Sequence, residues 1–555
     1  EMQRSLVGSE MCIRDRGGTA EVLEYFRMIL SFCPFRGTEA FFVGKYNPFR
    51  HFHTQAARQS EFKGGIISMY PECEEIMRLA PDYHIIPVCK EIYADVITPI
   101  TLLRKIAAVS KRYYLLESVE GGEKWGRYSF LGFDPIMRVT CSMDQVTIET
   151  EEGTKVKHTK KPLEIIREIL KGMKAPKIKG IPPFAGGFVG YFAYSMIGYA
   201  EPVLKIKKGD FPDYDLMLFD KVIAYDHLKQ KISVIVNMRT DHVMENYGKT
   251  TAKIQEMISL IRNGEASEIP VVDAKSKVEF TCNVSKEEYC RVVEKTKEYI
   301  VDGDIFQTVI SRQFTSPYEG SLMNPYRVLR TTNPSPYMVY MNMDGDEIMS
   351  TSPETLVRLK DGRLTTFPVA GSRPRGKTEA EDKALEEELL VDEKELAEHN
   401  MLVDLGRNDL GKISEFGSVE VTEYMMIHKY SKIMHICSQV ESNLREDGDA
   451  LSAIESVLPA GTLSGAPKIR ACEIIEELET EQRGIYGGAL GYIDFTGNMD
   501  TCIAIRMAVK KDGKVYVQAG GGIVADSIPE NEYEESANKA LAVMNAVKNA
   551  KEVLE

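Results

Sequence analysis

Residues 221–236 read Lys-Val-Ile-Ala-Tyr-Asp-His-Leu-Lys-Gln-Lys-Ile-Ser-Val-Ile-Val, and this stretch decides the fold class. Residues 221–225 and 232–236 are rich in β-branched and aromatic side chains, and the residues between them are mostly polar, as in a turn. We expect the two runs to pair as a hairpin. Hairpin pairing is antiparallel, whereas regular βαβ units give parallel strands. The stretch therefore favours antiparallel sheets.

Strand-like and helix-like segments lie on both sides of this hairpin. Further strand-like runs occupy residues 113–118, 129–132 and 139–146. Residues 186–191 are rich in glycine and aromatic residues, which suits tightly packed strands or a helix laid close on a sheet. Helices are expected from Pro99, over residues 241–263 and over residues 285–302, where Ser285 and Glu288 have the spacing of a capping box. Strands in runs, flanked by helices, predict an α+β fold.

Composition restricts the class of protein. The 555 residues are 43% hydrophobic and 27% charged, which is near the globular average and sufficient for more than one domain. The net charge of −14 argues against nucleic acid as the main partner, because phosphate binding needs a basic surface. The ten cysteines include no C-x-x-C pair, so we expect neither a zinc ribbon nor a disulfide framework, and a cytoplasmic location. No apolar run approaches the roughly 20 residues of a membrane span.

The beginning of the chain has a different character from the rest. Residues 5–16 resemble translated sequencing-adaptor sequence and do not form a secretory signal, so we expect residues 1–68 to be a non-native leader and Met69 a start. The polar run 264–277 is the best linker candidate. These features predict an N-terminal region at 69–270 and a second region at 271–555.

Two pairs of carboxylates are candidates for binding a cation. Glu395 and Glu398 lie three residues apart in a segment with helical character, and Glu532 and Glu535 repeat this spacing. Residues three apart share a helix face, so each pair could present oxygens to one Mg²⁺. A solvated acidic helix face also explains the spacing, and on spacing alone this explanation is favoured.

Other candidates remain ambiguous when taken alone. Gly520-Gly521-Gly522 follows a β-like segment and could form an anion-binding nest, part of a dinucleotide fingerprint with Ala525, or a plain strand-to-helix turn. Arg506, in the apolar strand-like run 503–509, needs an anionic partner, which could be a substrate carboxylate or an internal salt bridge. His435, taken alone, is more readily explained as a core residue with satisfied hydrogen bonds than as a base.

A set of ordered motifs resolves these ambiguities. The motifs are Gly303-Asp304-Ile305-Phe306-Gln307, Asn333-Pro334-Ser335-Pro336-Tyr337-Met338, Ser352-Pro353-Glu354, residues 368–376 (PVAGSRPRG), residues 397–404 (AEHNMLVD), residues 459–468 (PAGTLSGAPK), Gln518-Ala519-Gly520-Gly521-Gly522 and Asn538-Lys539-Ala540. In this order they resemble the chorismate-binding enzymes, and within that family the anthranilate synthase component I branch. The resemblance covers nearly everything after about residue 91.

The resemblance implies a fold and a set of site residues. The fold would be that of chorismate-utilising enzymes, with antiparallel sheets packed in a sandwich and helices outside. Glu398 and Glu535 would bind Mg²⁺, with Glu395 and Glu532 close behind. Glu354 would protonate the departing 4-hydroxyl of chorismate, and His435 would assist loss of the C2 proton with pyruvate. The substrate site would be lined by Gly371, Ser372, Thr462, Tyr486, Arg506, Gly520, Gly521 and Gly522.

Two positions bear on the reaction within the family. Where water-using isochorismate and salicylate synthases typically carry a lysine, this chain has Gln307, and where aminodeoxychorismate synthases typically carry a lysine, it has Ala370. Both favour conversion of chorismate and ammonia to anthranilate and pyruvate, the first committed step of tryptophan biosynthesis. Aminodeoxychorismate synthase is the alternative within the family. A dinucleotide-dependent oxidoreductase and a non-catalytic tryptophan sensor are the alternatives from other classes.

The resemblance also implies regulation and a partner. Residues 115–118, ending in Ser118, and Pro336-Tyr337-Met338 resemble the tryptophan-binding segments of feedback-inhibited relatives, although each also suits an ordinary β core. Because no glutaminase nucleophile motif is evident, ammonia would come from a separate glutamine amidotransferase subunit, in a heterotetramer.

Overall fold

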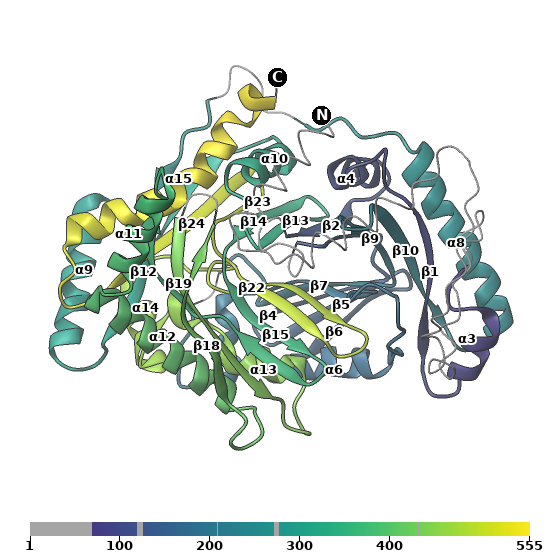
Figure 1. The fold of residues 1–555 in the computed structure, drawn as a ribbon, viewed down its shortest axis with the longest axis horizontal. Helices are drawn as coiled ribbons and strands as arrows, with labels where there is room; N and C mark the ends of the chain where they lie inside the picture. Colours follow the sequence, from purple (N-terminus) through teal and green to yellow (C-terminus); the bar gives the residue numbers. More distant parts are fainter. Residues whose placement is uncertain (1–68, 119–125, 208, 271–276, 431–432, 555) are drawn as a thin grey trace, which may run out of the picture. The chain divides into compact units, whose positions relative to one another are not determined.

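A computed structural model describes residues 69–118, 126–207, 209–270, 277–430 and 433–554. The predicted leader at 1–68 and part of the predicted linker, residues 271–276, lie outside the described residues. The described strands form two sheets of twelve, and every strand pair is antiparallel (Figure 1). The predicted α+β class and sandwich of antiparallel sheets are confirmed.

The first sheet contains the hairpin from which the fold was predicted. Residues Lys231–Val236 pair with Lys221–Asp226 in antiparallel register. In spatial order its strands are β1 (Ile85–Tyr93), β10 (Lys231–Arg239), β9 (Lys221–Asp226), β3 (Tyr128–Phe133), β2 (Arg112–Glu117), β13 (Tyr337–Met343), β14 (Asp346–Ser352), β23 (Met507–Lys511), β24 (Lys514–Ile523), β12 (Gln307–Pro317) and β11 (Thr281–Cys282), and β20 (Gly465–Ala466) pairs with β12.

The second sheet draws equally on distant parts of the chain. In spatial order its strands are β17 (Val369–Pro374), β19 (Ile433–Asn443), β16 (Arg363–Thr366), β15 (Thr355–Lys360), β22 (Met499–Ile503), β21 (Ala489–Asp494), β7 (Gly187–Phe192), β8 (Tyr214–Phe219), β4 (Met137–Ser142), β5 (Gln145–Thr150) and β6 (Gly153–His158), and β18 (Glu420–Lys429) pairs with β19. Both sheets contain strands from before and after residue 270, so the predicted regional boundary remains a prediction.

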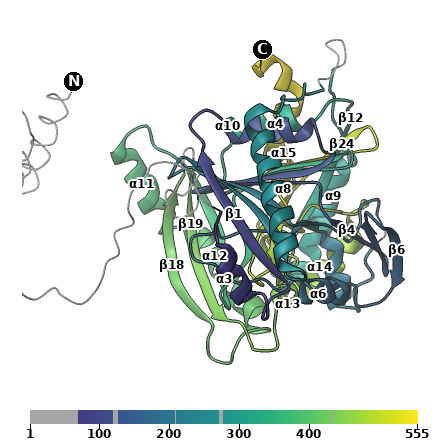
Figure 2. The ribbon, with the colours of Figure 1, turned by 90° about the vertical axis from the view of Figure 1, so that its right-hand side faces the viewer.

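Helices cover the outer faces of the two sheets. The helices are α3 (Cys73–Leu79), α4 (Pro99–Ala107), α6 (Leu163–Lys171), α7 (Ile197–Ala200), α8 (Val243–Asn263), α9 (Lys286–Val301), α10 (Met323–Thr332), α11 (Glu379–Leu389), α12 (Glu393–Gly411), α13 (Ala450–Val457), α14 (Lys468–Leu478) and α15 (Pro529–Leu554), with 3₁₀ turns η1 (Tyr194–Met196) and η2 (Gly461–Leu463). Figure 2 shows α8 and α3 beside β1. Within the part of the chain that the structure describes, the helices lack the combination of length and hydrophobicity that a membrane span requires.

Local signals explain several of these helices. The predicted capping box of α9 is present, since the Ser285 hydroxyl accepts a hydrogen bond from the Glu288 amide at 3.2 Å and the Glu288 carboxylate accepts one from the Ser285 amide at 3.0 Å. Helix α4 begins at Pro99, where Thr98 accepts from the Thr101 amide at 3.2 Å. Such caps satisfy amide groups that a helix leaves without partners at its start.

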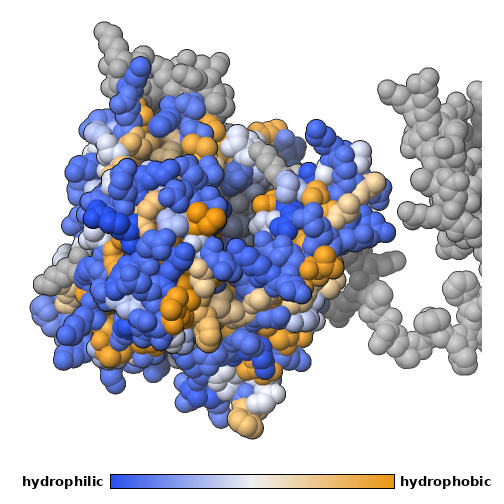
Figure 3. Space-filling model, turned by 90° about the vertical axis from the view of Figure 1, so that its left-hand side faces the viewer, coloured by the Kyte–Doolittle hydropathy of each residue, from blue (hydrophilic) through white to orange (hydrophobic). Residues whose placement is uncertain are grey.

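The core between the sheets is aromatic. Tyr114 of β2 meets Phe219 of β8 edge to face, with ring centroids 4.7 Å apart, and both side chains are fully buried. Separate apolar clusters lie between each sheet and its covering helices. The face that carries α9 and α11 is largely hydrophilic and is hollowed near its centre (Figure 3).

One predicted strand is wrong in detail. Residues 139–146 were expected to form a single strand, but β4 ends at Ser142 and β5 begins at Gln145. Met143 and Asp144 between them both have positive φ, at 50° and 66°, and make the turn of a hairpin. Two consecutive left-handed residues match the right-handed twist of the paired strands.

Candidate active site

Two of the places where the chain passes from one sheet to the other lie side by side. The first is Pro353–Glu354, between β14 of the first sheet and β15 of the second. The second is residues 504–506, between β22 and β23. The Ile503 amide donates to the Glu354 carbonyl at 3.0 Å, and the Thr351 amide donates to the Arg506 carbonyl at 3.1 Å. This seam brings two predicted site residues, Glu354 and Arg506, into one place.

Glu354 has the environment of a general acid. Glu354 is half-buried, and desolvation of its carboxyl group raises its pKa to about 8, while a hydrogen bond from Thr462 opposes the rise. The Thr462 hydroxyl in η2 donates to Oε1 at 3.0 Å. A carboxyl with such a pKa is mostly protonated at neutral pH and can donate a proton to a leaving group.

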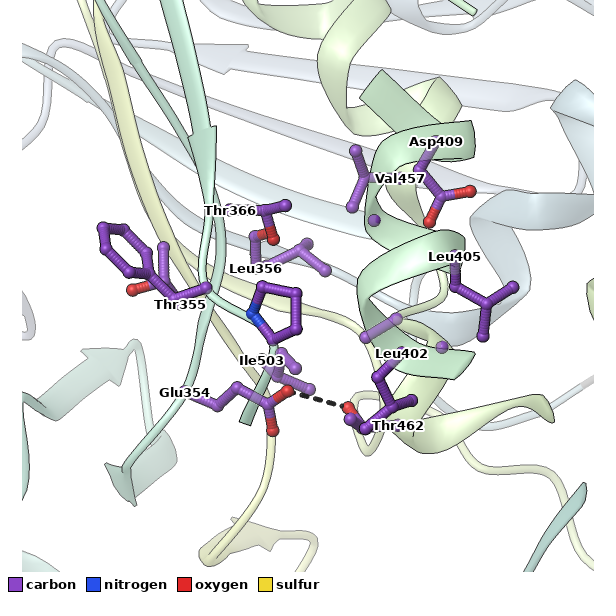
Figure 4. Close-up of a pocket in the computed structure, with 15 residues that line it drawn as sticks. Glu354, Thr355, Leu356, Thr366, Leu402, Leu405, Asp409, Val457, Thr462 and Ile503 are labelled. Carbon is purple, nitrogen blue, oxygen red and sulfur yellow. Dashed lines mark hydrogen bonds between the residues drawn. The ribbon is translucent and has the colours of Figure 1, made fainter. Parts of the chain in front are cut away.

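A small cavity of about 40 Å³ adjoins this carboxyl. Figure 4 shows Glu354 and Thr462 toward one end of its lining and Asp409 toward the other. Leu402, Val457 and Ile503 make much of the wall apolar. A water molecule needs about 10–15 Å³ by this measure, so the cavity can hold small molecules such as water or ammonia but no substituted ring.

His435 lies on β19 opposite Ser372 of β17. Its Nδ1 is 3.1 Å from the Gly371 carbonyl and 3.1 Å from the Ser372 hydroxyl. Because a carbonyl only accepts, this contact places the proton on Nδ1 and leaves Nε2 with a lone pair. Desolvation lowers the pKa of His435, and the Gly371 contact opposes this only partly. The imidazole is therefore neutral at pH 7 and can accept a proton.

Gly371 occupies a bulge that only glycine suits. Its φ is +68°, and the register of β17 against β19 shifts between Ala370 and Ser372. A Cβ at this position would lie 3.2 Å from Oε2 of Glu395. The bulge therefore lies against both His435 and Glu395, a member of the first carboxylate pair.

The four predicted carboxylates lie on two helices, α12 and α15, as the spacing predicted. Glu398 is hydrogen-bonded by the Gln307 side chain, and its pKa is raised by desolvation and by Glu395. The pKa of Glu532 is raised by desolvation and by Glu535, against a hydrogen bond from Ser527. Lys394 and Lys539 act electrostatically on both Glu398 and Glu532, so the two pairs share one neighbourhood.

The chemistry of this donor set fits a hard divalent cation. Among the described residues, Oε2 of Glu532 is buried and has no hydrogen-bond partner. A Cβ on Gly521 would lie 3.0 Å from that oxygen and 4.0 Å from Oε1 of Glu535. Among the described residues, no three side chains of histidine, cysteine, aspartate or glutamate are grouped closely enough to hold a metal by themselves. A Mg²⁺ ion commonly completes its shell with water and substrate oxygens, so this does not exclude it.

Arg506 and Tyr486 form the cationic and aromatic side of the seam. Arg506 was expected within a continuous strand, but it lies between β22 and β23 with φ at +49°, which turns the chain between the sheets. Its Nη1 donates to the Lys539 carbonyl at 2.8 Å. Desolvation lowers its pKa, so an anionic ligand would be strongly favoured there. Burial raises the pKa of Tyr486 to about 12.

The interpretation of Gly520-Gly521-Gly522 as a turn or anion nest is wrong. All three lie inside β24, paired with Ser311, Ile310 and Val309 of β12. Glycine is needed for close approach, because a Cβ on Gly520 would lie 2.5 Å from the Ile310 carbonyl oxygen and one on Gly522 would lie 2.7 Å from Nε2 of Gln307. The glycine strip thus makes room beside Gln307 and the carboxylates.

The two segments predicted to bind tryptophan are neighbours in the first sheet. Glu117 of β2 pairs with Met338 of β13, so Ser118 lies close to Pro336 and Tyr337. Glu117 is buried and accepts hydrogen bonds from Tyr326 at 2.8 Å and Arg330 Nε at 2.8 Å. The structure therefore brings these residues together, although they are far apart in the chain.

Lys539 was missed as a site residue. Its Nζ lies 2.6 Å from Oε1 of Glu535 and 3.2 Å from the Gly520 carbonyl. The motif Asn538-Lys539-Ala540 was noted without a role, although a Glu–Lys pair four residues apart on a helix predicts this contact.

These contacts define what the site can do. It combines a proton donor at neutral pH, a neutral imidazole, a desolvated guanidinium and two pairs of carboxylates that share one neighbourhood. Such a set can bind an anionic molecule, protonate a leaving hydroxyl and remove a carbon-bound proton.

Comparison with known proteins identifies relatives of this arrangement. Residues 112–545 match the family described as chorismate binding enzyme. Relatives include the anthranilate synthase component 1 of Acetivibrio thermocellus, which is 47% identical over 87% of this chain and 99% of the relative. That of Aquifex aeolicus is 45% identical over 86% and 98%.

Solved structures of other proteins are also similar to this chain. Anthranilate synthase component I from Streptococcus pneumoniae TIGR4 superposes with a TM-score of 0.68 at 35% identity, over 82% of this chain and 99% of that chain. The menaquinone-specific isochorismate synthase MenF from Escherichia coli reaches a TM-score of 0.62 at 17% identity, over 86% and 98%. The second likeness concerns the fold alone.

Proposed function

The chain belongs to the chorismate-binding enzyme family, with anthranilate synthase component 1 proteins among its relatives, and from this we propose that it converts chorismate and ammonia to anthranilate and pyruvate. The observation that carries the proposal is the desolvated Glu354, whose pKa of about 8 keeps it protonated at neutral pH. Gln307 and Ala370, in place of the two diagnostic lysines, favour ammonia as the nucleophile and anthranilate as the product.

The chain's own residues would act in two steps. Glu354 gives its proton to the 4-hydroxyl as ammonia forms a bond at C2, so that the C4–O bond breaks and water leaves. His435 Nε2 then takes the C2 proton, the bond to the enolpyruvyl oxygen breaks, and pyruvate departs as the ring becomes aromatic. Arg506 binds a carboxylate of the substrate. A Mg²⁺ ion held by Glu398 and Glu535, with Glu395 and Glu532 behind, would neutralise the other carboxylate.

Product analysis tests the proposal. The full chain, incubated with chorismate, Mg²⁺ and ammonium, is expected to give anthranilate and pyruvate in equal amounts. Chromatography with standards separates the candidate products. Isochorismate, salicylate or aminodeoxychorismate as the end product would exclude it.

We also propose a partner and an inhibitor. A glutamine amidotransferase subunit would supply ammonia in the cell, which agrees with the words "component 1" in the names of the relatives. Tryptophan would bind at Ser118, Pro336, Tyr337 and Met338, where β2 and β13 are paired.

The inhibitor site leads to a prediction about Ser118. Ser118→Arg should raise the tryptophan concentration for half-inhibition by at least about tenfold, because a long charged side chain would occupy the inhibitor's place. Ammonia-dependent turnover should remain. Ser118 follows the last residue of β2, and Val109 lies before its first residue. Val109 is 56% exposed, so Val109→Arg provides the matched control. An enzyme that is indifferent to saturating tryptophan would contradict the regulatory proposal.

A further inference from the structure

Glu354 lies in a very short crossing, and its position depends on what holds the two ends. Strand β14 ends at Ser352 and β15 begins at Thr355, so only Pro353 and Glu354 pass between the sheets. Within this crossing, the Glu354 amide is 3.4 Å from the Ser352 hydroxyl. The conformation of so short a linker depends on the residues at its two ends, and here these residues belong to different sheets.

Tyr337 is anchored at the first end through its backbone. It is the first residue of β13 and lies directly opposite Ser352 in the antiparallel pair of β13 and β14. Pairing at this register fixes the position of the last residue before the crossing.

The same residue reaches the second end through its side chain. The Tyr337 hydroxyl lies 2.9 Å from the Thr355 hydroxyl and donates to Oδ1 of Asp500 at 2.7 Å. The phenol has one proton, and it donates this proton in the hydrogen bond to the Asp500 carboxylate, so the Thr355 hydroxyl donates to the phenol oxygen. Thr355 is the first residue of β15, and Asp500 is on the adjacent strand β22.

The hydrogen bonds of this phenol lie in a desolvated region. Burial, followed by the charge of Asp500, raises the pKa of Tyr337 well above its ordinary value, so it remains a donor. Asp500 is also 3.4 Å from Nε of Arg358, which offsets its charge. Hydrogen bonds to an ionised group in a desolvated region are stronger than neutral ones. The bonds of the phenol to Thr355 and Asp500 therefore hold the second sheet to a tyrosine of the first.

We infer that Tyr337 is a positioning residue for Glu354, which it holds by binding Ser352 before the crossing and Thr355 after it. This inference rests on the proposed function, in which Glu354 is the acid. Misplacement of a catalytic group by about 1 Å can lower the rate about 100-fold. Loss of one of these two contacts should therefore lower kcat.

The test is Tyr337→Phe in the full chain, assayed with chorismate, Mg²⁺ and ammonium. The ring and the β13–β14 register remain, but the link to Thr355 is lost. We expect kcat to fall by about tenfold and KM for chorismate to change by less than about twofold, because Glu354 acts in the transition state more than in binding.

The pH profile supplies a second readout. Activity requires protonated Glu354 and is therefore lost as the pH rises through its pKa, which is about 8 in the intact site. Among the described residues, the Thr462 hydroxyl donates to Glu354, and Glu354 acts electrostatically on the Cys437 thiol of β19. Burial raises the pKa of Cys437 to about 12 and keeps it neutral. A loosened carboxyl would gain solvent, and its pKa would fall, so the alkaline limb of kcat should move to lower pH.

Tyr340→Phe is the matched control. Tyr340 lies on the same strand, is fully buried, and donates to Oε2 of Glu347 at 2.6 Å, away from the crossing. It should leave kcat and the pH profile unchanged. Thr355→Val, which removes the other partner of the phenol, should reproduce the effect of Tyr337→Phe and serves if that variant does not fold.

The outcomes separate this inference from the proposed function. If the parent chain makes no anthranilate, the proposed function fails. If the parent makes anthranilate while Tyr337→Phe and Thr355→Val keep its kcat and its alkaline limb, the positioning role is wrong.

Discussion

Glu354→Gln is expected to lower chorismate consumption by at least about 100-fold, because the amide cannot give a proton to the departing hydroxyl and general acid catalysis is worth about 100- to 10,000-fold. Glutamine keeps the size of the side chain and can still accept the Thr462 hydrogen bond. The fold should therefore persist, which circular dichroism and thermal unfolding would check.

The pH dependence of the parent enzyme belongs to the same prediction. Because desolvation raises the pKa of Glu354 to about 8, turnover should be sustained below that pH and decline above it. The residual activity of Glu354→Gln should lack this limb. Glu347→Gln is the control, since Glu347 is a buried carboxyl of β14 that lies outside the seam. A Glu354→Gln variant that consumes chorismate at the parent rate would refute the assignment.

His435→Ala provides the contrasting variant. His435 would act after amination, so its loss should slow elimination while chorismate is still consumed, and aminodeoxyisochorismate should accumulate. Glu354→Gln should accumulate nothing. If His435→Ala slows consumption and anthranilate release in parallel, without an intermediate, His435 shapes the pocket and another group takes the proton.

Glu398→Gln is expected to abolish turnover at limiting Mg²⁺, with a loss of at least about 100-fold, because it removes a charged ligand of the ion that would offset the substrate's charge. Glu535→Gln should behave in the same way. Neither change should unfold the chain. Each removes one carboxylate of a pair whose two members repel each other.

Binding can be measured apart from activity. A ligand that binds only the folded state raises the melting temperature, and the rise grows with the ratio of ligand concentration to Kd. Mg²⁺ should therefore stabilise the parent chain, and this stabilisation should be much weaker in Glu398→Gln. Glu534→Gln is the matched control, because Glu534 is on the same helix as Glu535 but points to Lys286 at the surface. Parent-like turnover of Glu398→Gln at limiting Mg²⁺ would contradict the ligand assignment.

Several elements could be predicted because their signals are local. The hairpin of β9 and β10, the capping box of α9 and the helices that carry the two carboxylate pairs all depend on residues within a few positions of one another. The ordered motifs also indicated the family, which the comparisons confirm.

Two of the wrong predictions share one cause. Gly520-Gly521-Gly522 has the local composition of a turn, yet it lies inside a strand because β12 and Gln307 approach it closely. Arg506 lies in an apolar run, yet the chain leaves one sheet at this residue and joins the other. In both places the deciding partner is far away in the sequence.

The sequence by itself thus determined the α+β class, the family and the residue types of the site, since each follows from short-range patterns and motif order. The tertiary structure alone decided how those residues behave. The pKa of Glu354 depends on the protein that surrounds it, with Thr462 beside it, and its placement depends on Tyr337, Thr355 and Asp500. Desolvation and cross-sheet hydrogen bonding are properties of groups that meet only when the two sheets pack together.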